Sequence, residues 1–139
     1  MKRMIIVTLL AASVTLGANA QKITAAKVPD IVRTAFINTY PKAKEVAWEK
    51  EKSGDYEANF EQDQEEMSVV YNKLGVALEV ETEIAVSGLP VAVQNALKGK
   101  KIKEAARITK GGKTYYEAEL GGKDFLFDAS GKAVAATKD

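Results

Sequence analysis

The sequence contains neither histidine nor cysteine, and these two absences remove much of the chemistry open to a chain of 139 residues. Without histidine the chain lacks the commonest general base, and without cysteine it lacks a thiolate nucleophile. The same two residues supply most of the tight ligands for zinc, copper and haem. We therefore assign no catalytic residue, no metal ligand and no cofactor, and we predict that the protein is not an enzyme.

Strong charge of one sign is also absent, since 20 Lys and Arg stand against 19 Asp and Glu. Lys2 and Arg3 belong to a segment that we expect to be removed, which leaves 18 basic against 19 acidic residues and a net charge of −1. Nucleic-acid-binding domains are strongly basic on at least one face. The balance therefore predicts no nucleic-acid partner.

Long apolar runs are missing everywhere except at the N-terminus. Met1 to Arg3 form a positive segment, Met4 to Leu16 an apolar run, and Ala18-Asn19-Ala20 has the small-x-small pattern of a signal-peptidase site. The run is too short to span a membrane, and no cysteine follows it that could carry a lipid. We predict a signal peptide over residues 1–20, cleavage after Ala20, a periplasmic location and no membrane insertion after cleavage.

The most informative feature of the sequence is a short motif that occurs twice. GDYEANF, residues 54–60, is followed sixty positions later by TYYEAEL, residues 114–120. Both phrases alternate apolar and polar residues, as half-buried strands do. We predict a single domain over residues 21–139 that consists of two repeats, about 27–86 and 88–135.

Each repeat is predicted to begin with a helix that opens at a proline, because proline suits the first turn of a helix. The first helix runs from Val28-Pro29 to near Tyr40-Pro41, and the second starts at Leu89-Pro90. The apolar side of the second helix is predicted to consist of Val93, Ala96 and Leu97. In each repeat an aromatic strand is followed by a turn that closes with a glycine, Gly75 or Gly131.

Alternation along the strands separates an apolar face from an acidic face. The apolar face is predicted to carry Val46, Trp48, Tyr56, Ala58, Phe60, Met67, Val69, Tyr71, Leu78, Val80, Thr82, Ile84, Val86, Tyr116, Ala118 and Leu120. The opposite face carries glutamates, and we predict that it is open to solvent. The two helices then cover the apolar face of a roughly eight-stranded antiparallel sheet, which is an α+β fold.

A series of short motifs along the whole chain after residue 20 is similar to the PepSY-like, beta-lactamase-inhibitor-like family of periplasmic proteins. The matching residues are Val28-Pro29, Ala35-Phe36, Tyr40-Pro41-Lys42-Ala43, Val46-Ala47-Trp48-Glu49, Gly54 to Phe60, Glu79 to Ile84, Leu89-Pro90, Tyr115 to Glu119 and Phe127 to Gly131. The resemblance implies two tandem helix-plus-antiparallel-sheet units in an exported, non-enzymatic protein. Relatives by fold include inhibitors that dock a sheet face on an enzyme. The chain departs from the pattern at Lys98 to Lys101, where a second aromatic-proline pair is usual.

The acidic face carries the candidate site. Its predicted partner-binding residues are Glu57, Glu79, Glu81, Glu83, Tyr115, Glu117 and Glu119. An aromatic side chain beside carboxylates on an exposed face is typical of a protein-binding patch. We predict a binding module that meets a protein partner there and, as the resemblance implies, inhibits or modulates a periplasmic protein.

A cation or small-molecule carrier that uses the same carboxylates is the alternative. Neighbours on one face of a strand lie ~6.8 Å apart, whereas calcium needs several oxygens at ~2.3 to 2.6 Å. Carboxylates from other strands, such as Glu57 or Glu117, would therefore have to converge. A hydrolase with paired carboxylates is disfavoured, because an open face gives the two carboxyls no burial to separate their pKa values.

Overall fold

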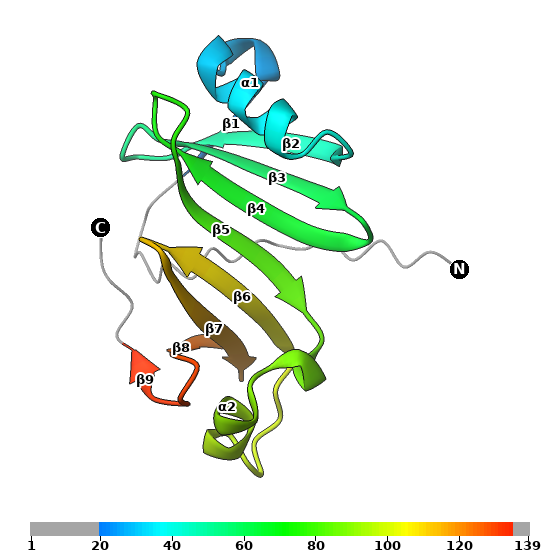
Figure 1. Cartoon of the computed structure of the whole chain (residues 1–139), viewed down its shortest axis with the longest axis vertical. Coiled ribbons are helices and arrows are strands. Elements are labelled where there is room, and N and C mark those ends of the chain that lie inside the picture. The colour runs from blue at the N-terminus through cyan, green and yellow to red at the C-terminus, as the bar shows by residue number, and fades with distance from the viewer. Residues whose placement is uncertain (1–19, 135–139) are drawn as a thin grey trace.

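The computed structural model describes residues 20–134, in which nine antiparallel strands follow one another in sequence order across a single sheet (Figure 1). The strands are β1 (Gln21–Ile23), β2 (Lys44–Lys50), β3 (Tyr56–Gln62), β4 (Glu65–Tyr71), β5 (Ala77–Ile84), β6 (Glu104–Lys110), β7 (Lys113–Leu120), β8 (Lys123–Phe127) and β9 (Ala133–Val134). The helices are α1 (Asp30–Thr39) and α2 (Val91–Ala96), preceded by the 3₁₀ turns η1 (Ala25–Lys27) and η2 (Val86–Gly88). The α+β prediction is confirmed, with nine strands where roughly eight were expected. The predicted signal peptide lies outside the described residues except for Ala20.

Both helices begin directly after a proline, as the sequence predicts. Pro29 and Pro90 take the N-cap positions of α1 and α2, with φ of −55° and −52°. α1 ends at Thr39, because Pro41 disfavours a helical conformation of the residue before it, Tyr40. The N–H of Tyr40 caps the helix by donating to the Phe36 carbonyl. α2 has only 6 residues against 10 in α1. The second helix is thus shorter than the first, and it is the helix that lacks an aromatic-proline pair after its end.

The core has two clusters on the same face of the sheet, one under each helix. Under α1, the Phe36 ring packs against Phe60 and Trp48, with ring centroids 4.9 and 5.3 Å apart. Under α2, Val93 is fully buried among the side chains of the second half of the sheet. Val80 packs against the first cluster and Ile84, on the same strand and face, against the second. Strand β5 therefore joins the two cores.

The order of elements in the second half is the same as in the first. A strand, a 3₁₀ turn, an α-helix and three further strands follow one another twice, from β1 to β4 and from β5 to β8. Each set of strands ends in a glycine turn that lies against the first turn of its helix. A Cβ on Gly75 would lie 2.9 Å from the Ile31 carbonyl oxygen, and one on Gly131 would lie 2.5 Å from that of Ala92. Both positions have positive φ, +78° and +82°, which glycine adopts without strain.

Three residues predicted to face the core lie at the surface instead. Val46 is 39 % exposed and lies where the register of β2 against β3 shifts between Lys44 and Ala47, so the alternation of faces is interrupted at this point. Leu78 is also 39 % exposed. Ala96 is exposed at the end of the short α2. Trp48 is buried in the core as predicted, and Tyr56 is half-buried.

Candidate functional site

The sheet face opposite the helices is hollow, and this corrects the prediction of an open face. A cavity of about 480 Å³ lies on it, and both Lys22 of β1 and Asp124 of β8 line that cavity. In a flat sheet these strands would be about 34 Å apart. The sheet must therefore curve around this face, as twisted and bulged sheets do.

Carboxylates dominate the lining of this hollow, which we call the acidic cavity. Its ten carboxylates are Glu45, Glu49, Glu61, Glu66, Glu81, Glu83, Glu104, Glu117, Glu119 and Asp124. Lys22 is the only basic residue among the lining residues of the described chain. The cavity therefore has a strong excess of negative charge wherever these carboxyl groups are ionised. Groups that are not ionised hold a proton instead.

Four of the seven predicted site residues line the acidic cavity, namely Glu81, Glu83, Glu117 and Glu119. Glu57, Glu79 and Tyr115 do not. Glu79 lies beside the cavity, where it pairs with Lys110 at 3.5 Å. Tyr115 is half-buried next to Ile108 on the neighbouring strand. The structure therefore brings four of the predicted residues together at one cavity and leaves the other three outside its lining.

Glu117 is the most unusual residue of the cavity. Only 7 % of it is exposed, and its Oε2 atom is fully buried without a hydrogen-bond partner in the described part of the chain. Its neighbours across the strands are Ala106 and Leu126, which offer no charge to pair with it. Burial raises the pKa of Glu117 to about 8, and the charges of Glu81 and Asp124 add to this shift. The carboxyl group therefore holds a proton at neutral pH.

Glu81 lies at the middle of the sheet, on β5, which joins the two halves. Its neighbours across the strands are Ser68 on β4 and Ile108 on β6. Burial raises the pKa of Glu81 to about 7, with further contributions from Glu79 and Asp124. Glu81 thus changes charge close to neutral pH.

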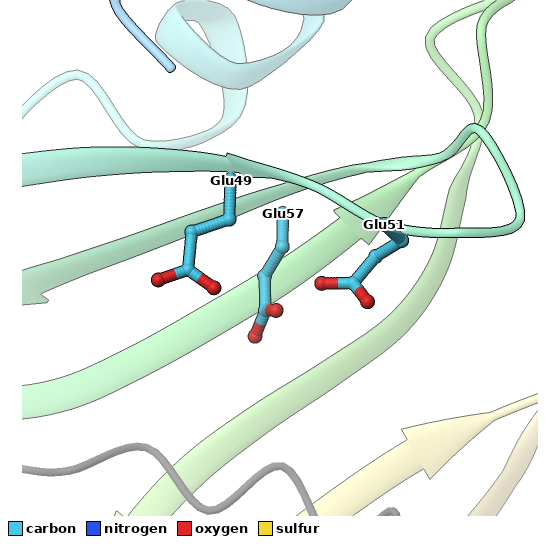
Figure 2. A group of neighbouring side chains, drawn as sticks. All are labelled: Glu49, Glu51 and Glu57. Atoms are coloured by element: carbon cyan, nitrogen blue, oxygen red, sulfur yellow. The ribbon is translucent and has the colours of Figure 1, made fainter. Parts of the chain in front are cut away.

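Glu57 belongs to a group of three carboxylates at the end of β2 and the start of β3, shown in Figure 2, which shares Glu49 with the lining of the acidic cavity. Oxygens of Glu49, Glu51 and Glu57 all lie within 4.8 Å of one another. Glu57 is only 4 % exposed. Burial, followed by a hydrogen bond with the Glu51 side chain and the charge of that group, raises the pKa of Glu57 to about 8.

Sequence reasoning missed Glu49 and Glu51 as members of this group. A signal was present, because both glutamates precede a turn at Gly54 and Glu57 follows it, so that a hairpin brings them together. The structure pairs Glu49 directly with Glu57 across β2 and β3. Carboxylate oxygens at this separation can close around one cation, since calcium takes several oxygen ligands.

The reason given against a paired-carboxylate hydrolase, an unburied face, is wrong for this structure. Glu81 and Glu117 are both desolvated in the cavity. Acid–base catalysis by two carboxyls nevertheless needs one pKa raised and the other kept low. Here both pKa values are raised, to about 7 and about 8. The arrangement is suited to binding a cationic ligand. Each carboxyl can ionise once a positively charged group of the ligand lies beside it.

Comparison with known proteins identifies the fold. Neither a protein-family profile nor a curated protein matches the sequence. Among solved structures, a proposed periplasmic protein of Bacteroides eggerthii has a TM-score of 0.71 at 20 % identity, over 78 % of this chain and 86 % of that one. A DUF2874 family protein of Bacteroides uniformis has a TM-score of 0.68 at 21 % identity, over 77 % and 86 % of the two chains. A BLIP-like protein of Bacteroides fragilis has a TM-score of 0.64 at 23 % identity, over 77 % and 84 %.

These TM-scores establish a shared fold, so the chain has a BLIP-like α+β fold. The fold neighbours include a protein proposed to be periplasmic. Neither α1 nor α2, nor any other helix within residues 20–134, has the length and apolar character needed to cross a membrane.

Proposed function

We propose that the protein is an exported, non-enzymatic binding module that receives part of a partner protein in its acidic cavity. The observation that carries this proposal is the buried, unpartnered carboxyl oxygen of Glu117. A buried acceptor without a hydrogen bond destabilises a fold by about 1 to 3 kcal/mol. A partner that makes a hydrogen bond to this oxygen removes the penalty and gains the same free energy as binding affinity.

Export and the mode of action are further parts of the proposal. The N-terminal signal pattern and a fold neighbour proposed to be periplasmic support a location in the periplasm. Inhibition or modulation of a periplasmic protein is what the resemblance to the PepSY-like, beta-lactamase-inhibitor-like family implies. The BLIP-like neighbour supports that resemblance at the level of the fold.

The test is capture of a partner from periplasmic extract by the protein and by two charge-reversal variants. Glu104→Lys places a positive charge at the acidic cavity, whereas Glu65→Lys makes the same change at an exposed strand position outside its lining. We expect Glu104→Lys to lose the partner and Glu65→Lys to retain it, with both variants folded by circular dichroism. Equal capture by the two variants would contradict the assignment of this face as the binding site.

Cation binding is a second candidate function, favoured by the convergence of Glu49, Glu51 and Glu57. Three carboxylates can supply up to about six oxygens, the lower end of the range that calcium takes. Titration calorimetry with calcium should then show binding that the Glu51→Gln variant weakens, since Glu51 lies at the end of the hairpin and is not deeply buried. An absence of binding heat in the wild-type protein at millimolar calcium would exclude this function.

A further inference from the structure

Two side-chain oxygens of the acidic cavity are buried without a hydrogen-bond partner in the described chain, Oε2 of Glu117 and Oδ1 of Asn59. A protonated Glu117 can donate as well as accept, but an ionised Glu117 only accepts, as Oδ1 of Asn59 does. A ligand that satisfies both oxygens in the ionised state has to donate hydrogen bonds. Lysine and arginine side chains carry several donors and no acceptor, so they complement such a lining in both charge and hydrogen bonding.

The cavity carboxylates are distributed across strands and are not gathered around one point. Glu81 on β5 and Glu117 on β7 are separated by one strand and offset by two residues along it, which places their backbones roughly 12 Å apart. Within residues 20–134, Glu49, Glu51 and Glu57 are the only three acidic side chains whose oxygens all lie within 4.8 Å of one another. A single metal ion therefore does not suit the cavity, whereas several cationic groups on one chain do.

Apolar side chains occupy the sheet between these two carboxylates. On β6, Ile108 is the direct neighbour of Glu81, and Ala106 is the direct neighbour of Glu117. Both β6 residues are buried, each 6 % exposed. The methylene stems of lysine and arginine pack on apolar surface while their charged ends contact acidic groups. Ala106 lines the cavity and Ile108 does not, so the apolar part of the lining next to Glu117 suits the stem of a basic side chain whose charged end reaches the carboxylates.

From these observations, and resting on the proposed function, we infer that the partner enters the acidic cavity with a segment that carries several lysine or arginine residues, whose cationic groups contact Glu81 and Glu117. Contact with a cation favours the ionised carboxylate, so binding releases the protons that burial places on these two groups. The charged groups that face them are Glu79, Glu83, Glu119 and Asp124. Lys103 pairs with Glu119 at 3.6 Å and Lys110 with Glu79 at 3.5 Å, at the edges of the same surface.

The test uses two synthetic peptides and the protein purified from the periplasm after expression of the full chain. One peptide alternates arginine with alanine over ten residues, and the other replaces each arginine by citrulline, which has nearly the same shape and no charge. Titration calorimetry should show binding of the arginine peptide and at least about tenfold weaker binding of the citrulline peptide. Binding of the arginine peptide should strengthen from pH 6 to pH 9 and release protons, measured in buffers of different ionisation enthalpy.

The Glu81→Gln/Glu117→Gln variant keeps the shape of both side chains and removes their ability to ionise. We expect it to bind the arginine peptide at least about tenfold more weakly than the wild type does and without proton release. The matched control is Glu65→Gln, at an exposed position outside the cavity lining, which should bind as the wild type does. Equal binding of the two peptides by the wild type, or unchanged binding by the double variant, would overturn the inference.

The outcomes also separate this inference from the proposed function. A partner captured by the wild type, lost by Glu104→Lys and not displaced by the arginine peptide would leave the proposed function intact and overturn the basic-segment inference. Peptide discrimination without capture of any periplasmic protein would contradict the proposed function while supporting the ligand chemistry. Spermidine that binds as tightly as the arginine peptide would assign the cavity to small polyamines and overturn the inference of a protein segment.

Discussion

The stability of this protein should fall as the pH rises from 5 to 9, which is unusual for a protein without histidine. The pKa is raised from 4.5 to about 8 in Glu57 and Glu117, and from 4.5 to about 7 in Glu81. For a carboxyl group with a raised folded-state pKa, the folded chain holds a proton that the unfolded chain has released. Its contribution to stability is therefore complete below pH 4.5 and is lost as the pH rises through the folded-state pKa.

The size of the effect follows from these shifts. One pKa unit corresponds to about 1.4 kcal/mol, so the three groups together set an upper limit of about 13 kcal/mol. This limit is comparable with the whole stability of an ordinary domain, which is about 5 to 15 kcal/mol. Entry of water and the mutual dependence of neighbouring carboxyls reduce it. We expect a loss of about 4 kcal/mol in the free energy of unfolding between pH 5 and pH 9.

Urea denaturation followed by tryptophan fluorescence measures this loss directly, since Trp48 is the only tryptophan and is buried in the core. The Glu57→Gln/Glu81→Gln/Glu117→Gln variant should lose most of the pH dependence and be more stable than the wild type at pH 9. The exposed variant Glu65→Gln should follow the wild-type curve. A wild-type stability that stays constant or rises from pH 5 to pH 9, or an unchanged slope in the triple variant, would refute the reasoning.

Three further predictions concern the fold and its processing. Gly131→Ala should destabilise the protein by about 2 to 4 kcal/mol, because its Cβ would meet a carbonyl oxygen at positive φ; Gly54→Ala, also at positive φ but with no atom near its Cβ, should cost only about 1 kcal/mol. Val93→Ala, under α2, should lower the free energy of unfolding by about 1 kcal/mol or more, and the urea midpoint reported by Trp48, under α1, should fall with it. An unshifted midpoint would show that the two halves unfold independently. Mass spectrometry of the exported protein should find Gln21 as its first residue, and retention of Ala20 would show that cleavage occurs elsewhere.

Local features of the fold could be predicted from the sequence because each depends on few residues. Pro29 and Pro90 mark the helix starts, and the alternation around Ala58 and Ala118 assigns the strand faces. In each case the determining residues lie within a few positions of the element they define. The interruption of β2 next to Val46 could not be predicted in this way, because alternation alone does not reveal a shift in register.

The sequence predicts which sheet face carries the candidate residues, but not that this face is hollow. Hollowing depends on the shape of the whole sheet. Parity placed Glu57 and Glu117 on the face opposite the helices, which the structure bears out. Their burial depends on how strongly the whole sheet curves, and curvature is the sum of twist and bulges over all strands. The same curvature gives carboxyls expected to be exposed a pKa of about 8. Only the hairpin that joins Glu49 and Glu51 to Glu57 left a local signal in the sequence.

The two ends of the sheet have a consequence for how the protein meets other chains. The described sheet begins with β1, of 3 residues, and ends with β9, of 2 residues. β1 pairs only with Trp48 to Lys50 of β2, and the described part of β9 pairs only with Leu126 and Phe127 of β8. Lys44 to Ala47 and Lys123 to Phe125 therefore have no outer strand partner within the described sheet. Each of these segments begins with a lysine, and charged side chains on an edge disfavour the addition of another strand. A partner that extends the sheet would have to pair with one of these two short segments.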